Sequence, residues 1–300
     1  MRKKVLVLGA SGMLGLEVIR ELLSKNLDLY ASIRNSKDVL KIKKYLNTDI
    51  SKIKFINFKI DGNYKKKLKN LVNKKDYIVN CIGVIKPYID EYNIDSIKNA
   101  IKVNSLFPHE LNNCVKNKAK IFQIATDCVY DGVKGRYCEN DSHNANDIYG
   151  KSKSLGEVKS DNFYNIRCSI IGKEIKSFKS LLCWFLNQHD NAHLFGFKNH
   201  LWNGITTRHF GKIVSILITK NIKIPNMLHI VPSNTVNKFQ LLKLFQRKFN
   251  RFDLKITKKN ADIVVNRNLR TNFEKVNKKI NSILGYKKLP TINQMINEII

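Results

Sequence analysis

The stretch Val5-Leu-Val-Leu-Gly-Ala-Ser-Gly-Met-Leu-Gly-Leu-Glu-Val-Ile19 determines the fold. An apolar strand pattern ends at Gly9, and a helical pattern begins near Gly12. The glycines are spaced as GxxGxxG. Gly9 permits a tight turn, Gly12 lets the backbone approach a pyrophosphate, and Gly15 lets the helix pack closely on the strand. This order predicts a dinucleotide-binding turn whose contact residues are Gly9, Ser11, Gly12, Met13, Leu14 and Gly15.

Strand and helix patterns alternate after this turn. Further strands are predicted at 27–33, 53–60, 77–82 and 120–125, and a long amphipathic helix at 96–116 contains Asn104 and Pro108, which could kink it. Such alternation predicts an α/β fold with a Rossmann-type, doubly wound parallel sheet. We expect an NAD(P)-binding domain at 1–167. Residues 168–300 are expected to form mainly a smaller substrate-binding lobe, interwoven with the first domain.

Several polar residues and glycines follow the predicted strands, where ligands of such sheets bind. Arg34 stands where many NAD enzymes place an acid for the ribose 2′-hydroxyl, so a 2′-phosphate and NADP(H) are favoured over NAD(H). Asp61 could meet the adenine edge, and Gly83 begins a loop expected under the nicotinamide ribose. These residues extend the predicted cofactor site across the sheet.

The run Ile124-Ala-Thr-Asp-Cys-Val-Tyr-Asp131 brings Thr126 to a strand end, and Tyr149 precedes Lys153 by four residues in a helical segment. That spacing puts the phenol and the ammonium on one helix face. A nearby ammonium is expected to lower the phenol's pKa from about 10. The three side chains are therefore candidates for exchanging a proton with a carbonyl or alcohol.

Composition limits the alternatives. The chain has 300 residues, is 43% hydrophobic and carries a formal charge of +30. Lysines are spread along it without an arginine-rich stripe, so we predict no nucleic-acid partner. No apolar run approaches the roughly 20 residues of a membrane span. Six scattered cysteines without a CxxC pair, and histidines without ligand spacing, predict reduced cytoplasmic thiols and no metal.

Five motifs make the chain resemble an extended short-chain dehydrogenase/reductase of the dTDP-4-dehydrorhamnose reductase-like, sugar-nucleotide-binding branch. These motifs are Gly9-Ala-Ser-Gly-Met-Leu-Gly15, Ala125-Thr-Asp-Cys-Val-Tyr-Asp-Gly132, Tyr137-Cys-Glu-Asn-Asp141, Tyr149-Gly-Lys-Ser-Lys-Ser-Leu-Gly-Glu157 and Ile166-Arg-Cys-Ser-Ile-Ile-Gly172. The resemblance implies a catalytic set of Thr126, Tyr149 and Lys153, with Lys153 also holding the cofactor. It implies a supporting role for Asn104 beside the cofactor.

Two positions depart from related enzymes. Sugar-nucleotide 4,6-dehydratases typically carry Thr-Asp-Glu, and here Cys128 replaces the Glu. Epimerase-reductases of the fucose type place cysteine directly after the Ser/Thr, where this chain has Asp127. Simple hydride transfer remains, as an NADP(H)-dependent reductase of a nucleotide-linked 4-keto sugar for surface polysaccharide precursors. Two alternatives stay open: a nucleotide-sugar epimerase, which Arg34 disfavours, and a non-catalytic dinucleotide-binding regulatory subunit.

The pattern is less regular after Gly172. Helices are predicted near 180–188, 209–219, 237–249 and 292–299, and an aromatic loop at 195–208. The resemblance implies that this lobe binds a nucleotide sugar. It is also compatible with a homodimer. Trp202 could either stack on substrate or plug the seam between the lobes. The predicted substrate-binding residues are Lys86, Asp127, Lys198, Trp202, Asn203 and Arg208.

Overall fold

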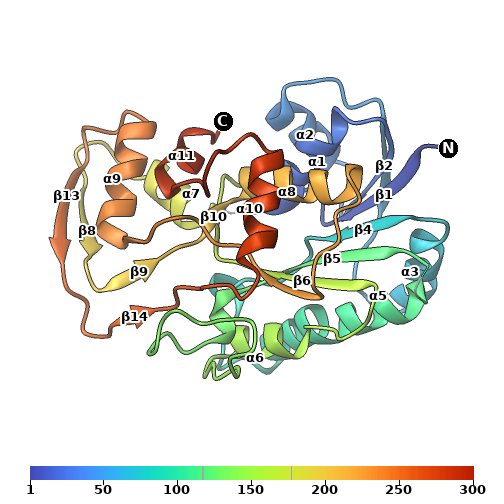
Figure 1. Ribbon diagram of the computed structural model, residues 1–300, viewed down its shortest axis with the longest axis horizontal. Coiled ribbons are helices and arrows are strands. Elements are labelled where there is room, and N and C mark those ends of the chain that lie inside the picture. Colours follow the sequence, from blue (N-terminus) through green and yellow to red (C-terminus); the bar gives the residue numbers. More distant parts are fainter. Residues whose placement is uncertain (117, 177) are drawn as a thin grey trace.

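The computed structural model describes residues 1–116, 118–176 and 178–300. Within these residues the central layer is a seven-stranded parallel sheet in the order β11-β6-β5-β4-β1-β2-β3 (Figure 1). The order reverses between β1 and β4, which marks the ligand-binding edge of such sheets. The predicted Rossmann-type fold is confirmed. The strands are β1 (Lys3–Leu8), β2 (Leu27–Ile33), β3 (Ile53–Asn57), β4 (Tyr77–Asn80), β5 (Lys120–Ala125), β6 (Phe163–Arg167) and β11 (Met227–His229).

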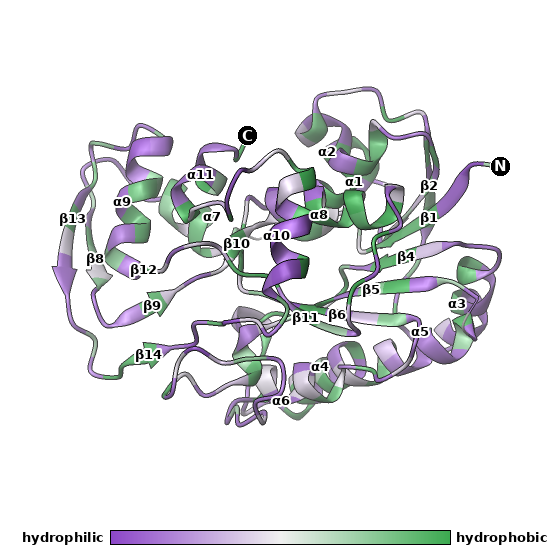
Figure 2. Ribbon diagram, in the orientation of Figure 1, coloured by the Kyte–Doolittle hydropathy of each residue, from purple (hydrophilic) through white to green (hydrophobic). Residues whose placement is uncertain are grey.

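Helices cover both faces of the sheet (Figure 1). Side chains of β1 alternate between two cores: Val5 and Val7 join the larger one, and Leu6 and Leu8 join the other. In Figure 2 the central strands are largely hydrophobic, whereas hydrophilic residues dominate the outer loops. One face carries α1 (Met13–Leu23), α2 (Asp38–Leu46) and α8 (Thr207–Thr219), and the other carries α3 (Tyr64–Val72), α5 (Phe107–Val115) and α6 (Ile148–Leu155).

The helix predicted at 96–116 consists of three segments. They are α4 (Ile94–Ala100), a π-helical turn η2 (Ile101–Leu106) and α5. Proline has no N–H, so the carbonyl of Asn104 lacks the donor that residue 108 would supply in a regular α-helix. Pro108 accordingly lies at the start of α5, and the wider turn precedes it.

The C-terminal part forms a lobe of short strands and helices beside the sheet (Figure 1). The prediction of an irregular loop at 195–208 was wrong, because this stretch pairs with distant strands: β8 with β13, β9 with β12 and β14, and β10 with β7. Helix α10 was not predicted. These elements are β7 (Ile170–Ile171), α7 (Leu181–Leu186), β8 (His193–Phe197), β9 (His200–Trp202), β10 (Ile205–Thr206), β12 (Val236–Asn237), α9 (Lys238–Lys248), β13 (Lys255–Lys259), β14 (Val265–Asn266), α10 (Glu274–Ile283) and α11 (Ile292–Asn297).

The later half of the chain also returns to the sheet. Helix α8 packs on α1, and β11 pairs with β6 at the sheet edge. The guanidinium of Arg208 on α8 lies 3.4 Å from Glu17 and 3.1 Å from Glu21, both on α1. This junction ties the two halves of the sequence into one unit.

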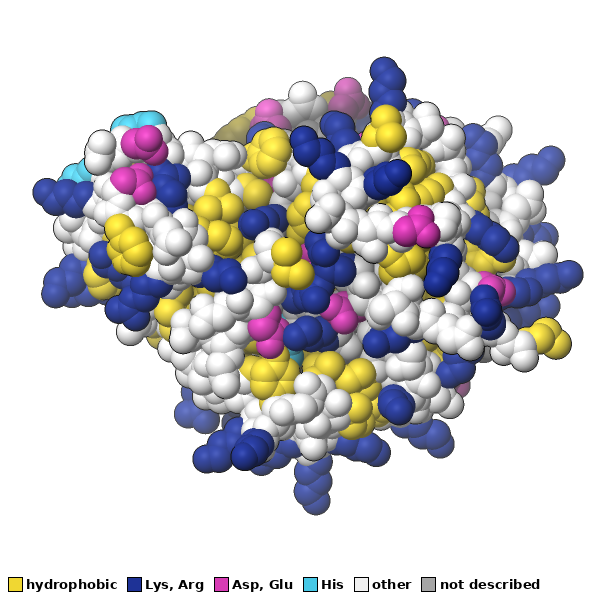
Figure 3. Space-filling view, turned by 90° about the horizontal axis from the view of Figure 1, so that it is seen from above, with side chains coloured by type: hydrophobic (Ala, Val, Ile, Leu, Met, Phe, Trp, Pro, Cys, Tyr) yellow, Lys and Arg dark blue, Asp and Glu magenta, His cyan; other side chains and the backbone are white. Residues whose placement is uncertain are grey.

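Basic side chains are scattered over the face shown in Figure 3 rather than gathered into one patch. None of the helices in residues 1–116, 118–176 and 178–300 is long and apolar enough to cross a membrane.

Candidate functional site

The glycine-rich turn leaves the N-terminus of α1 open to an anion. No side chain caps it at Gly12, and its first turn holds no acidic residue. The first N–H groups of a helix lack intrahelical partners and attract phosphate. A methyl group at Gly15 would overlap the carbonyl oxygen of Gly9, so helix and strand could not approach as they do. The residues Ser11, Met13 and Leu14 surround this end, and the turn fits a dinucleotide pyrophosphate.

The other predicted cofactor residues lie just beyond the carboxyl ends of parallel strands. Arg34 directly follows β2 and Asp61 follows β3, and both are exposed. Gly83 is exposed in the loop after β4. The structure adds an acid that the sequence did not single out. Asp38, the first residue of α2, is buried and accepts a hydrogen bond from the Ser11 hydroxyl at 3.1 Å.

Thr126 and Tyr149 meet at the end of β5. Thr126 caps the 3₁₀ turn η3 (Asp127–Val129) by accepting a hydrogen bond from the Cys128 N–H at 3.2 Å, and its hydroxyl lies beside the phenol of Tyr149. Helix α6 can approach this turn closely because Gly150 has no side chain. A methyl group there would overlap the carbonyl oxygen of Cys128. Asp147 caps α6 by accepting a hydrogen bond from the Gly150 N–H at 2.7 Å. The phenol of Tyr149 is therefore held at the ligand-binding edge of the sheet.

The pKa of Tyr149 is shifted in the direction opposite to the prediction. Burial raises the pKa of Tyr149, and the neighbouring Cys128 and Asp127 act in the same direction, while the Thr126 hydroxyl partly opposes them. The ammonium of Lys153 instead donates to the carbonyl oxygen of Ile124 at 2.9 Å. Burial also lowers the pKa of Lys153 to about 8. Desolvation outweighs the expected stabilisation of a phenolate, so Tyr149 stays protonated at neutral pH.

Asn104 organises the loop beside this pair. Its side chain accepts from the Val84 N–H at 2.9 Å, donates to the Val84 carbonyl at 2.9 Å and donates to Ser152 on α6 at 3.1 Å. A methyl group at Gly156 would overlap the Asn104 carbonyl oxygen. The π-helical turn thus fixes the loop containing Gly83 against α6.

Two cations from the C-terminal lobe face this edge, and sequence reasoning missed both. Arg267 donates to the carbonyl oxygens of Tyr130 at 2.9 Å and Asp131 at 3.3 Å. Burial raises the pKa of the Asp127 carboxyl, and the charges of Arg267 and Lys238 oppose that rise. Burial lowers the pKa of Lys238 at the start of α9. The only local signal for Arg267 is an arginine in a chain whose basic residues are mostly lysine.

Some of the predicted substrate residues lie at the ligand-binding edge of the sheet, and others lie elsewhere in the molecule. Asp127 is buried beside Thr126, which donates to its carboxylate at 3.2 Å. Lys86, in the 3₁₀ turn η1 (Lys86–Tyr88), pairs at 2.8 Å with Asp147, which caps α6. Asn203 exchanges two hydrogen bonds with the backbone of Leu269 at 2.6 and 2.9 Å, and so holds the segment that carries Arg267.

Three other predictions concern residues with structural contacts. Trp202 is buried and donates to the Ser169 hydroxyl at 2.9 Å, as expected of a seam plug. Lys198 is exposed in the turn between β8 and β9, where its N–H donates to the Lys259 carbonyl at 2.9 Å. The structure does not bring Arg208 to the site, because its guanidinium is engaged by carboxylates of α1.

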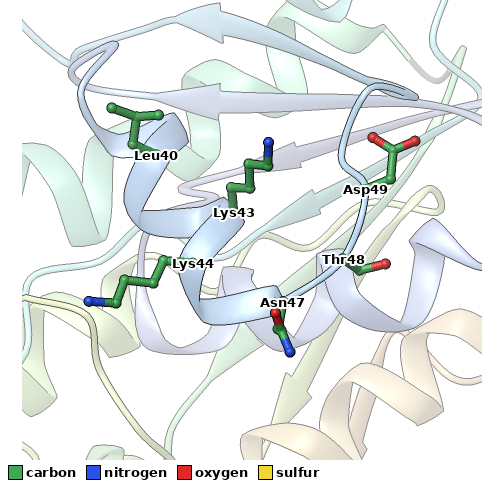
Figure 4. A pocket seen from close by; sticks show the side chains of 6 residues that line it. All are labelled: Leu40, Lys43, Lys44, Asn47, Thr48 and Asp49. Carbon is green, nitrogen blue, oxygen red and sulfur yellow. The ribbon is translucent and has the colours of Figure 1, made fainter.

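A surface hollow lies on α2 and the turn after it (Figure 4). It contains none of the predicted site residues. The side chains that line it are Leu40, Lys43, Lys44, Asn47, Thr48 and Asp49.

Comparisons with known proteins agree with this geometry. A dTDP-4-dehydrorhamnose reductase from Clostridium acetobutylicum is 19% identical and superposes with a TM-score of 0.70 over 98% of this chain and 97% of its own. The enzyme of that name from Bacillus anthracis, in complex with NADP, is 16% identical, with a TM-score of 0.74 over 100% and 99%. A dTDP-glucose 4,6-dehydratase from Bacillus anthracis, in complex with NAD, is 16% identical, with a TM-score of 0.72 over 99% and 94%.

Sequence comparison is more specific about the family. No curated protein matches the chain. The profile of the RmlD substrate binding domain matches residues 2–281. The chain therefore belongs to the RmlD substrate binding domain family, the branch of extended short-chain dehydrogenases/reductases that its motifs indicate.

Proposed function

We propose that this protein is a cytoplasmic NADP(H)-dependent reductase of a nucleotide-linked 4-keto sugar, used for surface polysaccharide precursors. One observation carries the proposal: the phenol of Tyr149, whose pKa is raised by burial, lies beside Thr126 at the sheet edge that the open N-terminus of α1 also faces. Family membership and the NADP named in the Bacillus anthracis complex support it.

A bound nicotinamide dinucleotide supplies the hydride. Tyr149 donates its proton to the substrate carbonyl oxygen as negative charge develops there, and its raised pKa keeps that proton available. Thr126 hydrogen-bonds the same oxygen. Lys153, one helical turn further along α6, binds the nicotinamide ribose through its ammonium.

The charges around this edge suit an anionic substrate and cofactor. Arg267 and Lys238 bind the diphosphate of the nucleotide sugar, and Asp127 orients the sugar between them and Thr126. Arg34, exposed after β2, binds the 2′-phosphate of the cofactor. Asp61 contacts the adenine end of the cofactor, and Gly83 contacts its nicotinamide end.

The test is a screen of the purified protein with NADPH against nucleotide 4-keto sugars, following the loss of reduced-cofactor absorbance. Turnover of one or more such sugars is expected. Interconversion of a nucleotide sugar without net oxidation of NADPH would favour the epimerase. Dinucleotide binding with no turnover of any substrate would favour the regulatory subunit.

A further inference from the structure

Three side chains from distant parts of the sequence meet at the phosphate-binding turn. The ammonium of Lys176 lies 2.6 Å from the Asp38 carboxylate and donates to the Ser11 hydroxyl at 3.1 Å. Ser11 in turn donates to the same carboxylate oxygen of Asp38 at 3.1 Å. Ser11 directly precedes Gly12, the residue at the N-terminus of α1. A half-buried ion pair therefore stands beside the place where a dinucleotide phosphate binds.

Lys176 comes from a strap, defined here as residues 173–176 and 178–180, between β7 and α7. Ser180 holds the two ends of the strap together. Its N–H donates to the Glu174 carboxylate, and its hydroxyl donates to the Gly172 carbonyl oxygen. Lys179 lies 4.7 Å from the centre of the Tyr88 ring, beyond β4. The strap thus contacts the phosphate turn through Lys176 and the loop after β4 through Lys179.

Asp38 and Arg34 give opposite signals for the choice of cofactor. An acid some 20 residues beyond the glycine turn hydrogen-bonds the ribose 2′-hydroxyl of NAD, whereas an arginine there accommodates a 2′-phosphate. Asp38 is 5% exposed at its side chain, and Lys176 is 26% exposed. At such a partly dry position an unneutralised carboxylate strongly repels a further phosphate.

We infer that Lys176 is a specificity-determining residue: by neutralising Asp38 it allows a 2′-phosphorylated dinucleotide to bind. Without its ammonium, Asp38 would repel NADPH and leave NADH the better ligand. The inference rests on the proposed function, since it concerns the cofactor of that site. It assigns a residue of the strap, 138 positions from Asp38, to cofactor choice.

The experiment measures dissociation constants for NADPH and NADH by cofactor fluorescence, without substrate. Lys176→Met should weaken NADPH binding by about tenfold or more and change NADH binding by less than about threefold. The double variant Asp38→Asn/Lys176→Met removes both charges and should restore the NADPH affinity to within about threefold of wild type. Lys179→Met is the matched control on the strap, and it should leave the NADPH-to-NADH ratio unchanged.

Equal weakening of both dinucleotides by Lys176→Met, or failure of the double variant to recover, would overturn the inference and leave Lys176 as a structural anchor. Thermal unfolding of each variant identifies any loss of the fold. A wild-type protein that binds both dinucleotides but reduces no keto sugar would overturn the proposed function, while the affinity ratios still decide the role of Lys176. Binding of neither dinucleotide would overturn both.

Discussion

Tyr149 is the residue on which the proposed chemistry depends. Tyr149→Phe keeps the ring and removes the proton that the substrate carbonyl requires, so kcat should fall about 10²- to 10⁴-fold. NADPH affinity should persist, because the phenol hydroxyl is assigned to the substrate. Single-turnover reduction at saturating NADPH measures the chemical step. The exposed Tyr92 gives a matched control, Tyr92→Phe, with no expected effect. A wild-type rate in Tyr149→Phe would exclude it as the acid.

Arg34 is expected to contribute to NADPH binding through its exposed guanidinium after β2. Arg34→Ala should weaken NADPH about tenfold and leave NADH nearly unchanged, since a bidentate charge-assisted contact to the 2′-phosphate is lost. Fluorescence titration of both dinucleotides tests this. Lys37→Ala, also exposed in the same loop, is the control for a general loss of positive charge. An unchanged preference in Arg34→Ala would contradict the assignment.

Lys153 should give cofactor binding a pH dependence. Burial lowers its pKa to about 8, so the ammonium is present below that pH and lost above it. NADPH affinity should therefore fall as the pH rises through about 8, no more steeply than about tenfold per pH unit. Lys153→Met has no charge to lose, so its weaker affinity should show no such fall. Parallel pH profiles in the two proteins would assign the dependence to another group.

At the scale of elements, the N-terminus of α1 depends on two glycines with different roles. A side chain at Gly12 meets only the Gly9 carbonyl, at 3.3 Å, whereas one at Gly15 overlaps the backbone of the turn. Gly12→Val should abolish dinucleotide binding and leave the protein folded. Gly15→Val should instead lower the melting temperature, because α1 must move away from β1. Calorimetry for binding and for unfolding separates the two. Undiminished cofactor affinity in Gly12→Val would refute the phosphate-turn assignment.

Element prediction succeeded where the pattern is local. The strands at 27–33 and 120–125 have the predicted bounds, and α6 carries Tyr149 and Lys153 as their spacing indicated. It was less accurate where a contact from elsewhere sets the geometry. The hydrophobic period did not predict the π-helical turn at 101–106, which lies beside Gly156 and Pro108.

At the scale of the whole molecule, the junction of α1 and α8 joins the two halves of the chain. Arg208→Ala should lower the free energy of unfolding by about 1–3 kcal/mol, because Glu17 and Glu21 lose a charged partner. Arg20 still pairs with Glu17 at 3.3 Å, which limits the loss. The KM for substrate should not change. Denaturant unfolding and steady-state kinetics measure the two effects, with the exposed Arg2→Ala as control. A raised KM with unchanged stability would return Arg208 to the substrate site.

The placement of the predicted cofactor and catalytic residues followed from the sequence, whereas the placement of the predicted substrate residues did not. Thr126, Tyr149 and the glycine turn belong to short motifs whose geometry is fixed within one strand or helix. Of the substrate residues, Asp127 and Lys86 lie near Thr126 and α6, while Arg208 does not. Arg267 reaches the site by contacts with a segment more than 130 positions earlier in the chain.

The sequence by itself determined the parallel sheet, the glycine-rich turn and the placement of Tyr149 and Lys153 on one helix, because alternation, glycine spacing and helical period act between near neighbours. Only the tertiary structure decided the charge states and the partners. Burial raises the pKa of Tyr149, and long-range pairing places Lys176 on Asp38 and Arg208 on Glu21. Such effects depend on which surfaces meet after folding, and the local pattern of residues does not encode the desolvation or the charge that a distant segment brings.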